Sequence, residues 1–89
     1  MTARHRIIVL DDEPGIVEVM VARLESMGFE AHGFTRAARA LDLLRKEEIS
    51  VFITDLKMPD MDGMEVLAAA KRIDPDVEVI IFTAYGSIE

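Results

Sequence analysis

Two hydrophobic patterns alternate along the chain. Short, nearly continuous runs of mostly β-branched apolar residues occupy Ile7–Leu10, Val51–Ile53 and Val77–Phe82. Such runs are typical of strands that are covered on both faces, as in a parallel sheet. The segment Glu30–Phe34 is more polar, which favours a strand at the edge of the sheet.

Between the predicted strands, apolar residues recur at helical spacing. Pro14 suits the first turn of a first helix, which Gly28 ends. Thr35 and Asp62 are predicted N-caps of a second and a third helix, and Pro75 ends the third. The residues predicted to face the core are Ile16, Val17, Met20, Leu24 and Met27 in the first helix, Ala37, Ala40, Leu41 and Leu44 in the second, and Val66, Leu67, Ala70 and Ile73 in the third.

The resulting order, β-α-β-α-β-α-β, predicts a doubly wound α/β fold. It implies a parallel sheet with right-handed crossovers and helices on both faces. Ser87 is a candidate cap for a fourth helix that the chain barely begins. We find no linker or repeat, so residues 1–89 are expected to form one domain. Ligands of such sheets bind beyond the carboxyl ends of the strands.

Composition and charge exclude several classes of function. The chain has no cysteine, so it carries neither a disulfide framework nor a thiolate metal site. Its net charge of −7 argues against direct nucleic-acid binding, because phosphates repel an acidic surface. The apolar run before Asp11 is too short for a signal peptide or a membrane span, so a cytoplasmic protein is expected.

Polar side chains fall where the predicted strands end. Asp11 and Asp12 follow the first strand, Asp55 ends the third and Thr83 the fourth. Three neighbouring carboxylates repel one another unless a cation lies among them. Hard oxygen ligands without a thiol or histidine favour Mg²⁺, and the loop after Asp55 can turn the backbone carbonyl of Lys57 toward it. The alternative is that the aspartates are solvated turn residues or helix caps.

These segments resemble a known family. IIVLDDEPG, VFITDLKMPDMDGME and VIIFTAYGS are similar to the motifs of the receiver domain of bacterial two-component response regulators. The closing TAYGSIE further resembles receivers of the nitrogen-regulation type, which precede a sigma-54-activating ATPase and a DNA-binding domain. The implied partner is a sensor histidine kinase, and the implied output is transcriptional.

The resemblance assigns roles to the acidic residues. Asp55 matches the phosphoacceptor, Asp12 a direct Mg²⁺ ligand and Asp11 an acid that holds the metal largely through water. Lys57 matches the residue that supplies a carbonyl ligand. The resemblance also implies that the domain is not an enzyme, but a phosphoacceptor with self-catalysed phosphotransfer and dephosphorylation at most.

It assigns roles to the end of the fourth strand as well. Thr83 matches the hydroxyl residue that hydrogen-bonds the phosphoryl group on activation. Ala84 matches the small residue beside it, which leaves the acyl phosphate open to attack. Tyr85 lies near the aromatic part of the switch.

The family also implies a flavodoxin-like strand order of 2-1-3-4-5, with a fifth strand and helix for which this chain has no counterpart. The invariant lysine at the end of the fifth strand is therefore missing, so the chain is expected to be a truncated fragment with impaired phosphorylation. The open edge Val77–Thr83 is expected to pair with another copy, giving a homo-oligomer.

Other classes fit less well. A dehalogenase-type phosphatase would have a second Asp where this chain has Lys57. An EF-hand loop around Asp60–Gly63 would need an oxygen ligand at Met58 and Glu at Ala69. A dinucleotide site would need a Gly-rich turn after the first strand. A receiver fold that serves only assembly, and is never phosphorylated, stays open as an alternative.

Overall fold

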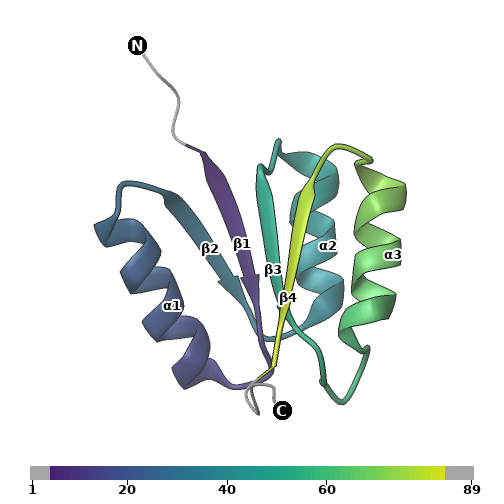
Figure 1. Ribbon diagram of the computed structural model, residues 1–89, viewed down its shortest axis with the longest axis horizontal. Coiled ribbons are helices and arrows are strands. Elements are labelled where there is room, and N and C mark those ends of the chain that lie inside the picture. Colours follow the sequence, from purple (N-terminus) through teal and green to yellow (C-terminus); the bar gives the residue numbers. More distant parts are fainter. Residues whose placement is uncertain (1–4, 84–89) are drawn as a thin grey trace.

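The computed structural model describes residues 5–83, which form four strands and three helices in strict alternation (Figure 1). The elements are β1 Arg6–Leu10, α1 Pro14–Ser26, β2 Glu30–Phe34, α2 Ala37–Lys46, β3 Val51–Asp55, α3 Gly63–Ile73 and β4 Glu78–Phe82. The predicted order of elements is confirmed. The predicted cap at Ser87 lies outside the described residues.

All strand pairs are parallel, and the strands lie in the order β2-β1-β3-β4. This confirms the predicted α/β fold for the four strands present. Within the described part of the chain, β2 and β4 are the two edge strands. The carboxyl ends of β1 and β3 are therefore neighbours at the centre of the sheet.

The helices cover the two faces of the sheet unequally. On one side α2 and α3 enclose the main core, to which the sheet contributes Ile8, Leu10 and Phe52 (Figure 1). On the other side α1 packs against β1 and β2 alone. No helix among the described residues covers that face over β3 and β4, and the Ile80 side chain is 52% exposed there.

The buried stripe of α1 is narrower than predicted. Val17 is buried, whereas Ile16, Met20 and Leu24 are half-buried and Met27 is 62% exposed. The expectation that Met27 faces the core is wrong, because α1 ends at Ser26 and Met27 is its C-cap residue, which lies in solvent.

The helix ends show which capping predictions hold. Gly28 has φ 96°, and the N–H groups of Gly28 and Phe29 donate to the carbonyls of Glu25 and Leu24, which ends α1 as predicted. Asp62 caps α3 in a reciprocal pair with Glu65. The prediction for Thr35 is wrong.

At α2 the N-cap position is Arg36, without a side-chain hydrogen bond. A carboxylate from another loop takes the capping role. The Asp60 side chain accepts from the Ala37 N–H at 3.4 Å, a long contact. The sequence pattern around Thr35 could not reveal a cap supplied 23 residues later.

Candidate functional site

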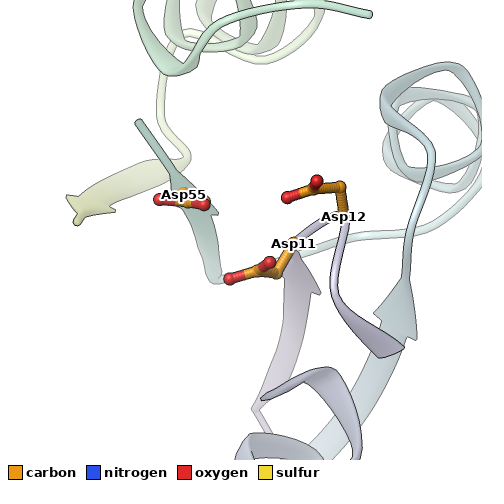
Figure 2. Close-up of side chains that lie close together, drawn as sticks. All are labelled: Asp11, Asp12 and Asp55. Atoms are coloured by element: carbon orange, nitrogen blue, oxygen red, sulfur yellow. The ribbon is translucent and has the colours of Figure 1, made fainter. Parts of the chain in front are cut away.

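Three carboxylates meet at the carboxyl ends of the central strands. Leu10 of β1 pairs with Thr54 of β3, so the residues that follow, Asp11 and Asp55, lie side by side. Asp12 joins them from the β1–α1 connection (Figure 2). One carboxylate oxygen from each of the three lies within 4.8 Å of the others. The predicted convergence of these side chains is confirmed.

Asp11 is the innermost of the three. Its residue is 1% exposed, and its Oδ1 accepts a hydrogen bond of 2.9 Å from the Glu13 N–H. Its Oδ2 is buried and has no hydrogen-bond partner in the described structure. Burial raises the pKa of the Asp11 carboxyl, and the charges of Asp55 and Asp12 raise it further, against the lowering effect of the Glu13 hydrogen bond.

Asp55 ends β3 and is also buried, whereas Asp12 is exposed. The ion pairs among the described residues involve Arg6, His32 and Arg45, none of which neutralises the three carboxylates. A buried carboxylate oxygen without a partner, beside two further carboxylates, is the environment that a hard divalent cation satisfies. The donor set therefore fits Mg²⁺.

The other predicted site residues lie close by in the chain. Lys57 is exposed in the loop between β3 and α3, and its role as a carbonyl ligand stays a prediction. Phe82 pairs with Asp55, so Thr83 follows one residue beyond this pair and is half-buried. The predictions for Ala84 and Tyr85 lie outside the described residues.

Two residues that the sequence analysis did not assign to the site make hydrogen bonds to the backbone at Asp55 and Leu56. The Thr54 side chain is fully buried, and its hydroxyl donates to the Asp55 carbonyl at 3.1 Å. Gly63, the first residue of α3, donates its N–H to the Leu56 carbonyl at 2.7 Å. A glycine directly after a helix cap is a poor helix former. The poor helix propensity of glycine at this position was the signal in the sequence that could have identified Gly63.

A parallel α/β sheet with acidic side chains clustered at the ends of its first and third strands defines a class of protein. Comparison with known protein families identifies the family within this class. The family model of the response regulator receiver domain matches residues 7–89. The chain therefore belongs to the response regulator receiver domain family. This confirms the resemblance drawn from the sequence.

Similar proteins include bacterial transcriptional regulators. The chain is 37% identical over 82 residues to the transcriptional regulatory protein GlrR of Escherichia coli (strain K12). That match covers 92% of this chain but only 18% of GlrR, so the chain spans about a fifth of that relative. It is 34% identical to sporulation initiation phosphotransferase F of Bacillus subtilis (strain 168), covering 96% of this chain and 68% of that protein.

Solved receiver structures have the same fold. The response regulator TrrA of Thermotoga maritima, in complex with Mg²⁺ and BeF, superimposes with a TM-score of 0.85 at 32% identity. The match covers 92% of this chain and 71% of TrrA. No helix in the described part of our chain has the length and apolar character needed to cross a membrane.

Proposed function

We propose that Asp55 accepts a phosphoryl group from a sensor histidine kinase, with Mg²⁺ held by Asp11, Asp12, Asp55 and the backbone carbonyl of Lys57. The observation that carries the proposal is that one carboxylate oxygen from each of the three aspartates lies within 4.8 Å of the others. One of these residues, Asp11, also has a buried oxygen without a hydrogen-bond partner. Without a cation the three carboxylates repel one another, and together they offer the oxygen ligands that a hard divalent cation binds.

Asp55, Asp11 and Asp12 have different roles in the proposed phosphoryl transfer. An Asp55 carboxylate oxygen attacks the phosphorus of a phosphohistidine, the P–N bond breaks, and the imidazole leaves as the acyl phosphate forms. Asp11 and Asp12, with Asp55, would hold Mg²⁺, which when bound would supply neutralisation of the charge that develops during transfer. Asp55 lies at the end of a central strand, which positions its carboxylate for the attack.

The residues after β4 act once the acyl phosphate exists. Thr83 donates its hydroxyl to a phosphoryl oxygen, and Ala84 leaves the acyl phosphate accessible. The charge of the new phosphoryl group and its hydrogen bond with Thr83 then bias the conformational switch that signals activation. Asp55 is consumed in each transfer and regenerated by hydrolysis, so the domain is a phosphoacceptor and not an enzyme with an independent substrate.

The relatives support the partner and the output. A second structure of TrrA, 30% identical to this chain, shows it in complex with the histidine kinase ThkA. GlrR is a transcriptional regulatory protein, which supports an output in transcription, of the sigma-54 type that the TAYGSIE segment suggested. We place this activity in the cytoplasm, without direct nucleic-acid or membrane binding by the domain.

The test is Mg²⁺-dependent binding of beryllofluoride, followed by ¹⁹F NMR. We expect binding to the wild-type chain, loss of binding in Asp55→Asn, and unchanged binding in Asp42→Asn. Asp42 is a matched control because it is an exposed aspartate on α2 that pairs with Arg45. Binding that persists without the Asp55 carboxylate would contradict the proposal.

We propose that the 89-residue chain, taken by itself, is labelled slowly by acetyl phosphate. The lysine that the family places after its fifth strand has no counterpart here. Lys71 cannot replace it, because it donates to the carbonyls of Pro75 and Val77 at the opposite end of β4. Labelling at the rate of a full-length receiver would contradict this part of the proposal.

A second candidate function is assembly through the β4 edge. β4 is an edge strand of the described sheet, and Ile80 on it is 52% exposed. The receiver of NtrC4, 31% identical to this chain, was solved as a dimer. Pairing of two β4 edges would cover Ile80 and give each β4 a second hydrogen-bonded neighbour, with or without phosphorylation.

A further inference from the structure

Three hydrogen bonds hold the backbone at Asp55 and Leu56. The Asp55 carbonyl accepts from the Thr54 hydroxyl at 3.1 Å, and the Leu56 N–H donates to the Phe82 carbonyl at 2.8 Å. The next carbonyl, of Leu56, accepts from the Gly63 N–H at 2.7 Å. Contacts from β3, β4 and α3 therefore fix the backbone from which the Asp55 side chain projects.

Gly63 makes the closest of these approaches. A Cβ atom at this position would lie 2.8 Å from the Asp55 carbonyl oxygen and 2.9 Å from the Leu56 Cα. Both neighbours are backbone atoms, which cannot rotate away as the end of a side chain can. Among the described glycines only Gly28 has a positive φ, so Gly63 is required for its lack of volume and not for its conformational freedom.

The start of α3 cannot retreat easily to make room. Asp62 accepts from the Glu65 N–H at 2.9 Å, and Glu65 accepts from the Asp62 N–H at 3.0 Å. This capping box fixes the first turn of the helix. Residues on that turn, including the buried Val66, are packed in the main core. A side chain at position 63 would therefore force apart the first turn of α3 and the Asp55–Leu56 backbone, two segments that are both held in place.

We propose that Gly63 is a positioning residue for Asp55. It lets the first turn of α3 press against the backbone of the phosphoacceptor and, together with the Thr54 hydroxyl, holds the carboxylate where it shares a cation with Asp11 and Asp12. The inference rests on the proposed function and adds a requirement to it. The metal site depends on a glycine that offers it no ligand.

The experiment measures the Mg²⁺ affinity of the whole 89-residue chain by isothermal titration calorimetry, at a temperature where each variant is folded. In Gly63→Ala we expect the Kd for Mg²⁺ to rise about tenfold or more, since loss of the contacts that orient metal ligands typically costs about 10–100-fold in metal affinity. The readout is binding, so it does not depend on the rate of phosphorylation.

Gly33→Ala is the matched control. Its added Cβ would lie 2.3 Å from Val17 Cγ1, on the face of the sheet that α1 covers, so the same substitution strains the fold without touching Asp55. We expect a lower melting temperature and a Kd for Mg²⁺ within twofold of wild type. In Gly15→Ala no atom lies within 4 Å of the new Cβ, so this variant should change neither the Kd for Mg²⁺ nor the geometry of the metal site.

Thr54→Val provides a second, independent variant if Gly63→Ala does not fold. It keeps the volume of the side chain and removes the hydrogen bond to the Asp55 carbonyl, and we expect the Kd for Mg²⁺ to rise about threefold or more. A folded Gly63→Ala that binds Mg²⁺ within twofold of wild type overturns the inference. If that variant does not fold, unchanged binding in Thr54→Val overturns it instead.

Failure of the proposed function gives a different result. A wild-type chain that does not bind Mg²⁺ removes the metal site itself, and the positioning role of Gly63 with it. A wild-type chain that binds Mg²⁺ together with an unaffected Gly63→Ala removes only the positioning role.

Discussion

Leu10 and Thr54 are register partners in the parallel pair β1–β3, and this pairing sets Asp11 beside Asp55. A slip of one residue would turn one of the two carboxylates to the opposite face of the sheet, because side chains alternate along a strand. The register is fixed by burial, since Leu10 and Phe52 both belong to the core enclosed by α2 and α3. Core packing therefore determines the geometry of the acidic site.

The first prediction concerns Asp11 and Mg²⁺. In the absence of Mg²⁺ we expect Asp11→Asn to unfold at a higher urea concentration than wild type, because a buried charge repelled by Asp55 and Asp12 has been removed. With Mg²⁺ at a hundred times its Kd, wild type should gain about 2.7 kcal/mol in the free energy of unfolding, and Asp11→Asn should gain far less.

The control is Asp42→Asn, which makes the same chemical change on the exposed face of α2. Both its stability and its gain from Mg²⁺ should stay within about 0.5 kcal/mol of wild type. Equal gains from Mg²⁺ in Asp11→Asn and wild type would argue against a role for Asp11 in metal binding.

The second prediction compares two candidate caps. Asp62→Ala removes a capping box and should lower the free energy of unfolding by about 1 kcal/mol. Thr35→Ala should change it by less than about 0.5 kcal/mol, because the Thr35 position does not cap α2 in the structure. Urea unfolding measures both, and a larger loss in Thr35→Ala than in Asp62→Ala would contradict the observed helix ends.

The third prediction concerns pH. The hydrogen bond from His32, followed by the charge of Arg6, lowers the pKa of the Glu30 carboxyl below its ordinary value of 4.5. Because the folded pKa is lowered, the stabilisation by ionised Glu30 is complete above the ordinary pKa. It is lost as the pH falls through the folded pKa.

Urea unfolding of wild type and Glu30→Gln from pH 6 to pH 3 tests this linkage. The difference in unfolding free energy should be constant near pH 6 and shrink progressively below about pH 5. Glu18→Gln, an exposed acid on α1, should show a smaller change over the same range. A difference between wild type and Glu30→Gln that does not depend on pH would contradict the assignment.

The fourth prediction tests assembly through β4. A charge on an edge strand opposes its pairing with another chain, so Ile80→Lys should reduce self-association of the 89-residue chain at high concentration. The side chain is half exposed, so the monomer should lose little stability. Light scattering measures the association.

Val19→Lys is the control for this experiment. Val19 is 70% exposed on α1, away from the β4 edge, and the same charge placed there should leave association unchanged. If the wild-type chain is monomeric at all concentrations, the β4 edge is not an assembly surface. If Val19→Lys alone breaks the association, the surface lies on α1.

Much of the fold could be predicted because its signals are local. The apolar runs of β1 and β3 and the helical spacing in α2 identify elements without knowledge of their neighbours. Alternation of strands and helices leaves few topologies, so the carboxyl ends of the strands carrying Asp11 and Asp55 could be expected at one edge. The family motifs then supplied expected roles for these residues.

The sequence by itself determined the order of the elements and the types of residue that end the central strands. The tertiary structure decided how deeply each side chain is buried, that Asp60 and not Thr35 faces the start of α2, and that Gly63 presses on the backbone of Asp55. These features depend on contacts between segments distant in the chain. A local pattern can at most mark a residue, as the glycine after the helix cap does, and it does not encode these contacts, because burial and close approach are properties of pairs of surfaces and not of single segments.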